Sequence, residues 1–71
     1  MLHFFIPILA GMNPSVLIIE DEEKIAESIK EYLSANGFIC KWAKTIQEAR
    51  TMLDHAPYDC LLIDIGLPEG S

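Results

Sequence analysis

The chain has 71 residues, of which 51% are hydrophobic, and a formal net charge of −6. A chain of this length forms at most one small domain, which buries about 60% of the surface that its unfolded chain exposes. The hydrophobic content is too high for a disordered chain. The acidic balance argues against nucleic-acid binding, because phosphates would be repelled, and it favours a cation site or a basic partner.

The N-terminal segment, MLHFFIPILAGMNP, is apolar and contains no Lys or Arg. A secretory signal requires a basic N-terminal region and a membrane span requires about 20 apolar residues, so the segment fits neither pattern, and Pro7 interrupts it. Three interpretations stay open: a weak signal or membrane-surface segment, an added strand, or an upstream extension with Met12 as the more natural start. We favour the extension, which divides the chain into an N-terminal extension, 1–14, and one domain, 15–71.

A buried strand and an amphipathic helix are predicted next. The run SVLII from Ser15 is continuously β-branched and aliphatic, as in parallel strands that are covered on both faces. The stretch EEKIAESIKEYLSANG then places apolar residues at helical spacing, with charged residues on the other face. The predicted apolar face consists of Ile25, Ala26, Ile29, Tyr32 and Leu33. Asn36-Gly37 is expected to end this helix, because Gly accepts the left-handed conformation there.

The second half of the chain repeats the strand and helix pattern. FICKWAK alternates between two faces and predicts a short strand near an edge of the sheet. TIQE has the spacing of a capping box, and it begins a second helix with Ile46, Ala49 and Leu53 on its apolar face. Pro57 prevents this helix from continuing, and DCLLIDI is a third buried strand. Such alternation predicts an α/β fold with a parallel sheet and right-handed crossovers.

The two cysteines, Cys40 and Cys60, form no CxxC pair and no cluster with zinc spacing. Both lie in predicted strands. If these strands flank a third, the two Cα atoms are about 10 Å apart, which is too far for a disulfide. We interpret both as small core residues.

Acidic residues follow two of the predicted strands. Ligands of open α/β sheets bind at the carboxyl ends of the strands. Glu20 and Asp21 end the first strand and Asp64 lies near the end of the third, so the three carboxylates converge if these strands are neighbours. A divalent cation would relieve their repulsion, and hard oxygen ligands suit Mg²⁺. One carboxylate would stay free to act as a nucleophile towards a phosphoryl group.

A structural role for these acids is the alternative. Acidic residues after a strand often cap the following helix, which is an explanation for Asp21 or Glu22 alone. Asp64 is different, because a lone charge inside a buried strand is costly unless it is paired or bound to a metal. The chain has neither a GxGxxG nor a GxxxxGK[ST] loop, His3 and His55 are isolated, and no catalytic triad is evident.

The stretches VLIIEDEEKI and YDCLLIDIGLPEG resemble the receiver domain of two-component response regulators, over Ser15 to Ser71. DIGLPEG is especially similar to members with a winged-helix DNA-binding output domain. The resemblance implies a flavodoxin-like doubly wound parallel sheet, truncated to about βαβαβ with strand order 2-1-3. It also implies a cytoplasmic protein that is not itself an enzyme, and that interacts with a sensor histidine kinase but with no nucleic acid and no membrane.

The resemblance further implies a role for each site residue. Asp64 matches the phosphoacceptor, Asp21 the direct Mg²⁺ ligand, and Glu20 the acid that often acts on the metal through water. Gly66 matches the position whose backbone carbonyl binds the metal. A different function, that of a haloacid dehalogenase phosphatase, requires a second Asp two residues after the nucleophile, and Gly66 occupies that place.

The resemblance covers the first half of a receiver, which has about five βα units. The hydroxyl residue after the fourth strand and the lysine after the fifth are not matched, so we expect weak metal binding and poor phosphorylation. The third strand would be an open edge, which is a hazard for self-association. We therefore expect the chain to be unstable alone, or to be completed by another chain or by its own N-terminal segment. A non-catalytic receiver fragment, acting only as an interaction or swapped module, is the alternative function.

Overall fold

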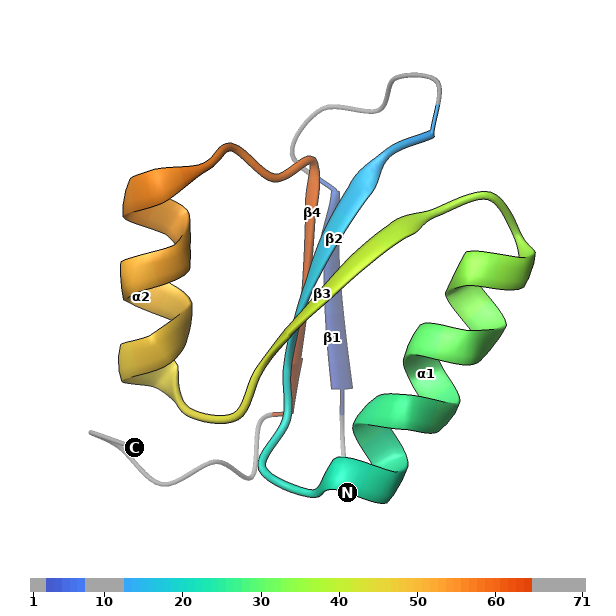
Figure 1. Ribbon diagram of the computed structural model, residues 1–71, viewed down its shortest axis with the longest axis horizontal. Helices are drawn as coiled ribbons and strands as arrows, with labels where there is room; N and C mark the ends of the chain where they lie inside the picture. The colour runs from blue at the N-terminus through green and yellow to red at the C-terminus, as the bar shows by residue number, and fades with distance from the viewer. Residues whose placement is uncertain (1–2, 8–12, 65–71) are drawn as a thin grey trace.

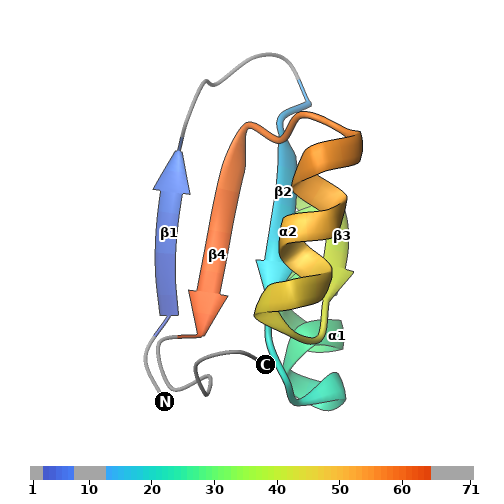
Figure 2. The ribbon, with the colours of Figure 1, turned by 90° about the vertical axis from the view of Figure 1, so that its left-hand side faces the viewer.

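The computed structural model describes residues 3–7 and 13–64, which form one four-stranded sheet and two helices. In chain order the elements are β1 (His3–Pro7), β2 (Ser15–Ile19), α1 (Glu23–Ala35), β3 (Ile39–Ala43), α2 (Ile46–His55) and β4 (Cys60–Asp64). The strand order across the sheet is β1-β4-β2-β3. Strands β3 and β4 run parallel to β2, and β1 runs antiparallel to β4. Figure 2 shows this as three arrowheads at one end of the sheet and that of β1 at the other.

Counted in chain order, the three parallel strands β2, β3 and β4 are the first, second and third strands of the predicted sheet. Their order in space, β3-β2-β4, confirms the predicted order 2-1-3 of a truncated flavodoxin-like sheet. One helix lies on each face of this sheet, α1 on one side and α2 on the other (Figure 1). The prediction of a parallel α/β fold followed from the alternation of strands and helices, and the structure has this alternation from β2 to β4.

Strand β2 is the centre of the sheet and contributes to two cores. Val16 and Ile18 pack on the α1 face, together with Cys40 and Cys60 from the neighbouring strands. The two residues between and after them, Leu17 and Ile19, pack on the α2 face with Ala43 and Ala49. Because successive side chains of a strand point to opposite faces, a strand covered on both sides must be apolar throughout. This is the physical reason for the unbroken run SVLII.

The C-terminus of α1 is closed by the predicted glycine. Gly37 has φ of +91°. The N–H of Phe38 donates to the carbonyl of Leu33, and that of Gly37 donates to Ser34, which is the paired bonding of a Schellman motif. The expectation that Tyr32 belongs to the apolar face is wrong, because its side chain is 69% exposed. Tyr32 lies at the margin of the helix face that packs on the sheet.

The N-terminus of α2 is capped as the sequence predicts. The N–H of Glu48 donates to Oγ1 of Thr45 at 3.0 Å, while the Glu48 carboxylate accepts from the N–H of Lys44, one residue before the cap. The apolar face differs from the prediction, because Leu53 is 38% exposed and Met52 packs against the core instead. The helical spacing permits either residue, and the position of the sheet decides between them.

Part of the apolar N-terminal segment forms strand β1, which pairs with β4. All five residues of β1 pair with β4, from His3 opposite Asp64 to Pro7 opposite Cys60. The added strand, which was the second interpretation of this segment, is therefore the one that the structure shows. Strand β1 occupies the edge that the third parallel strand would otherwise leave open, which confirms one of the expected outcomes, completion of the sheet by the chain's own N-terminal segment. Self-association through this strand, and Met12 as the natural start, stay predictions.

The two cysteines flank β2, as predicted. Cys40 and Cys60 are both buried and neither forms a disulfide, and both are paired in register with Val16, one on each side. Burial raises the pKa of the Cys40 thiol, although Ser34 and Lys30 oppose this shift. Cys40 is therefore an uncharged core residue, in agreement with its interpretation from the sequence.

A polar contact fixes the amino ends of β2 and β4. The carboxylate of Asp59 accepts from the N–H of Ser15 at 2.9 Å, and the N–H of Asp59 donates to the Ser15 carbonyl at 2.9 Å. This contact joins residues 44 positions apart, and the local sequence pattern did not indicate it.

Neither helix within residues 13–64 is long and apolar enough to cross a bilayer.

Candidate metal centre

Three acidic side chains meet at the carboxyl ends of two neighbouring strands. Glu20 and Asp21 directly follow β2, and Asp64 is the last residue of β4. Since β2 and β4 are parallel and Ile19 pairs with Ile63, both strands end at the same level. One carboxylate oxygen from each of the three acids lies within 4.8 Å of the others. The structure thus brings together three of the four site residues that the sequence singled out.

The cluster is buried on one side and open on the other. Glu20 is 0% exposed and Asp64 is 5% exposed, whereas Asp21 is exposed. Within the described residues, no buried side-chain nitrogen or oxygen lacks a hydrogen-bond partner. A cation or a phosphoryl group from solvent would therefore approach from the side of Asp21.

Glu20 is held firmly by its neighbours. Its N–H donates to the carbonyl of Ala43 at 3.1 Å, and its carbonyl accepts from the indole nitrogen of Trp42 at 2.7 Å. Its carboxylate oxygen Oε2 accepts from the N–H of Glu22 at 3.1 Å. The position of Glu20 is therefore set by the edge strand β3 and by the start of α1.

The helix-capping alternative for the acids does not describe this structure. Glu22 is the residue at the N-cap of α1, but its side chain makes no capping hydrogen bond. The carboxylate of Glu20 binds the Glu22 N–H instead. A buried acid of the cluster thus satisfies the N–H of the N-cap residue itself, which in a capping box is bonded by the side chain of the third helical residue.

The acids fit a small, hard cation. Mg²⁺ binds oxygens at 2.0–2.1 Å, so the oxygens of an octahedral site are about 3 to 4.2 Å apart. The three oxygens here lie within 4.8 Å of one another, so slight side-chain adjustment or one bridging water would bring them into range. Carboxylates are ligands that Mg²⁺ prefers over softer donors. Glu20, Asp21 and Asp64 could therefore hold this ion.

Gly66 and the two histidines are the other residues that the sequence analysis discussed. Gly66, the predicted carbonyl ligand, lies outside the described residues. His55 is exposed near the end of α2, with Nδ1 at 2.7 Å from the carbonyl of Thr51. The backbone of His3 pairs in register with Asp64. Sequence analysis had no signal for this proximity, because it depends on the pairing of β1. The interpretation of His3 as isolated concerns its side chain and stays a prediction.

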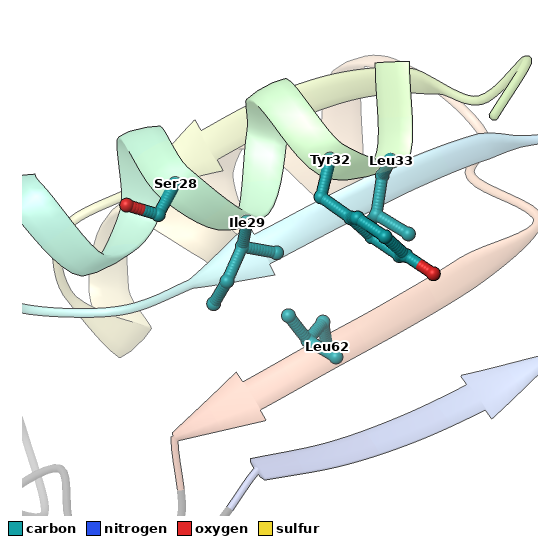
Figure 3. Close-up of a pocket in the computed structure, with 5 residues that line it drawn as sticks. All are labelled: Ser28, Ile29, Tyr32, Leu33 and Leu62. Carbon is teal, nitrogen blue, oxygen red and sulfur yellow. The ribbon is translucent and has the colours of Figure 1, made fainter. Parts of the chain in front are cut away.

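A groove on the α1 face has a different character from the acid cluster. It has a volume of about 390 Å³ and lies between α1 and β4 (Figure 3). Its lining is almost entirely apolar and comes from Ser28, Ile29, Tyr32, Leu33 and Leu62. Such a surface offers little to bind a phosphate or a cation. The chemistry of the described residues therefore concentrates at the acid cluster.

Comparison with known families agrees with this geometry. The family model of the response regulator receiver domain matches residues 16–71. The chain belongs to this family. Its three parallel strands and two helices are accordingly those of a truncated receiver fold, with the acid cluster at the carboxyl edge. Receiver domains in general use Mg²⁺ for phosphorylation, and the cluster could bind such an ion.

Curated relatives of this receiver chain are transcriptional regulatory proteins. PmrA of Pectobacterium parmentieri is 35% identical over 54 residues, and QseB of Escherichia coli O157:H7 is 38% identical over 53 residues. SrrA of Staphylococcus aureus strain NCTC 8325 is 36% identical over 58 residues. These matches cover 76%, 75% and 82% of this chain, but only 24% of each relative. The chain thus spans about a quarter of their length, and no solved structure gave a significant match.

Proposed function

We propose that this receiver chain accepts a phosphoryl group on Asp64 from a sensor histidine kinase, with Mg²⁺ held by Glu20, Asp21 and Asp64. The convergence of these acids from two distant segments supports the proposal. The Gly66 carbonyl is the proposed fourth protein ligand. We further propose that the chain acts in the cytoplasm and is a phosphoryl acceptor rather than an enzyme. In this proposal it supplies the accepting part of a regulator similar to its transcriptional relatives.

The proposed reaction transfers one phosphoryl group between two residues. A carboxylate oxygen of Asp64 attacks phosphorus, a new P–O bond forms, and the bond between phosphorus and the kinase histidine nitrogen breaks. The electron pair of that bond stays on the imidazole, and Asp64 becomes an acyl phosphate. Bound Mg²⁺ would neutralise charge on the phosphoryl oxygens.

The chain's own residues orient this reaction. The backbone of Glu20 is fixed by Ala43 and Trp42, and its carboxylate is held by the N–H of Glu22, so it cannot turn away from the cluster without breaking that last hydrogen bond. Asp21 is exposed and lies where solvent reaches the cluster. Asp64 is almost buried, and burial excludes water that would compete with the phosphoryl donor.

Metal binding can be tested with the single tryptophan of the chain. Trp42 contacts Glu20 directly, so titration with Mn²⁺ should change its fluorescence. Asp21→Asn should weaken Mn²⁺ binding at least about tenfold, because it removes an exposed proposed ligand. Glu27→Gln is the matched control, since it makes the same charge change at an exposed position of α1. Equal binding by all three proteins would contradict the metal site.

Phosphorylation can be tested with a small acyl phosphate donor and Mg²⁺. The expected product is an acid-stable, base-labile adduct in low yield, in line with the poor phosphorylation expected from the sequence, and mass spectrometry of peptides should place it on Asp64. Asp64→Asn should abolish the adduct, and removal of Mg²⁺ by a chelator should reduce it. An adduct that persists in Asp64→Asn would contradict the assignment of the acceptor.

A further inference from the structure

Helix α1 covers only part of its face of the sheet. Among the described elements it contacts β3 and β2 but not β4, and β4 contacts only its neighbouring strands. Leu62 of β4 packs against the core on the α1 face and is only half-buried. The apolar groove of about 390 Å³ lies over this part of the sheet, between α1 and β4 (Figure 3). It is a surface that none of the described elements covers.

The groove combines a hollow with a projecting aromatic ring. Ile29, Leu33 and Leu62 line it with half-buried apolar side chains. Tyr32 also lines it but is 69% exposed. Ser28 lies one helical turn before Tyr32 on the same rim, and its small side chain leaves room above the groove. The same patch therefore presents both a ring that could be buried and an apolar hollow that could receive one.

The charges beside this rim follow a definite order along α1. Lys24 lies four residues before Ser28 and Glu31 lies three residues after it, so both are on the Ser28 side of the helix, and both are exposed. The order along the rim is thus positive, neutral, negative. If two copies of α1 pack antiparallel about a two-fold axis near Ser28, Lys24 of each copy lies opposite Glu31 of the other. A partner with a single sign of charge would match only half of this order.

We propose that the α1 groove is the interface of a two-fold symmetric dimer of this chain, in which Tyr32 of each copy inserts into the groove of the other. A two-fold interface must be self-complementary, and the groove meets this condition in shape and in charge. Long side chains of a helix lean towards its N-terminus. In the antiparallel arrangement this direction brings Tyr32 of one copy towards Ser28 of the other. The proposal does not depend on the acid cluster or on phosphorylation.

The dimer is expected to be weak. The contact consists of one helix face and one groove, so its buried area falls below the roughly 1,200 Å² that separates stable complexes from transient ones. Each copy also has a net charge of −6, and the copies repel each other unless salt screens these charges. At an ionic strength of about 0.15 M we therefore expect a dissociation constant on the order of 100 μM. The chain is then monomeric at micromolar concentrations.

Sedimentation equilibrium of the full chain without divalent metal is the first test. The unsubstituted chain should pass from monomer to dimer between about 10 μM and about 1 mM. Tyr32→Ala should raise the dissociation constant at least about tenfold, because buried tyrosines are frequent hot spots of interfaces. Since Tyr32 is largely exposed in the monomer, the circular dichroism spectrum should not change. A chain that stays monomeric throughout, or a variant that dimerises equally well, would overturn the inference.

An exchange of charges tests the antiparallel arrangement. Lys24→Glu and Glu31→Lys each place like charges opposite one another, so each variant alone should dimerise at least about tenfold more weakly. An equimolar mixture of the two should form a mixed dimer, because both pairs across its two-fold axis then have opposite charges. Lys30→Glu is the matched control for Lys24→Glu. Its charge change is the same, but Lys30 lies on the side of α1 that faces Cys40, away from the groove.

The outcomes distinguish this interface from the other contacts of the chain. Pairing through an edge strand involves backbone groups, so it would not respond to Tyr32→Ala or to the exchange of charges. A dimer that ignores both would therefore overturn the inference. A mixture of Lys24→Glu and Glu31→Lys that stays monomeric would overturn it as well. The proposed function is decided separately, by Mn²⁺ binding and by the adduct on Asp64, which these substitutions on α1 leave in place.

Discussion

At the scale of single residues, Trp42 connects the edge of the sheet to the acid cluster. Its indole nitrogen donates to the carbonyl of Glu20 at 2.7 Å, and its ring packs against the core on the α1 face. Tryptophan combines a large apolar surface with one donor, so it can fill a core and satisfy a backbone acceptor together. The sequence predicted its strand and its face, but not its bond to Glu20.

Trp42→Phe removes this donor and keeps an aromatic ring. We expect a loss of about 1 to 2 kcal/mol in the free energy of unfolding, from the lost hydrogen bond and reduced burial. Urea denaturation followed by circular dichroism measures this change. Because the Glu20 carbonyl loses a contact, Mn²⁺ affinity, measured by calorimetry, should fall as well. A variant with unchanged stability and unchanged affinity would show that this bond does not support the cluster.

At the scale of elements, helix ends illustrate which features the sequence determines locally. The Thr45 cap and the Gly37 stop depend on residues within one turn of each other, and the structure contains both. The inward faces of the helices depend on the sheet, so the spacing alone admitted Tyr32 and Leu53, which are exposed. Local chemistry fixes where these helices end, whereas tertiary packing fixes which margin of each helix is buried.

Gly37→Ala tests the C-terminal motif of α1. A Cβ at this position would meet no atom within 4 Å, so any cost must come from the backbone, whose φ is +91°. A non-glycine residue in the left-handed region loses about 1 to 2 kcal/mol, and we expect a decrease of that size in the free energy of unfolding. Gly37→Asn should lose less, because Asn tolerates this region better. Equal losses in chemical denaturation would contradict a backbone origin.

At the scale of the whole molecule, the features that could be predicted are those that depend on residues close together in the sequence. Continuous apolar runs marked the parallel strands, and acids directly after β2 and within β4 marked the cluster. The pairing of β1 with β4 and the bond between Asp59 and Ser15 join segments far apart in sequence. Such contacts depend on which sheet edge and which backbone groups the rest of the fold leaves available. A local sequence pattern therefore does not predict these contacts.

The position of β1 leads to a prediction about association. Without residues 1–11, β4 would present unpaired backbone groups at the edge of the sheet, and such edges pair with other chains. We therefore expect a chain that starts at Met12 to associate at roughly micromolar concentrations or to lose its structure. Sedimentation velocity and circular dichroism measure these two results. A compact monomer with an unchanged spectrum would show that β1 is not needed to close the edge.

A peptide of residues 1–11 added to that shortened chain gives the complementary experiment. If the exposed edge of β4 causes the association, the peptide should occupy it and restore the monomeric particle. Of Phe4 and Phe5, one has its N–H directed towards β4. A peptide with proline at that position should not restore the monomer, because it lacks an N–H that the pairing requires. Restoration by both peptides would indicate a non-specific apolar effect. Restoration by the unsubstituted peptide alone would show that backbone pairing with β4 closes the sheet.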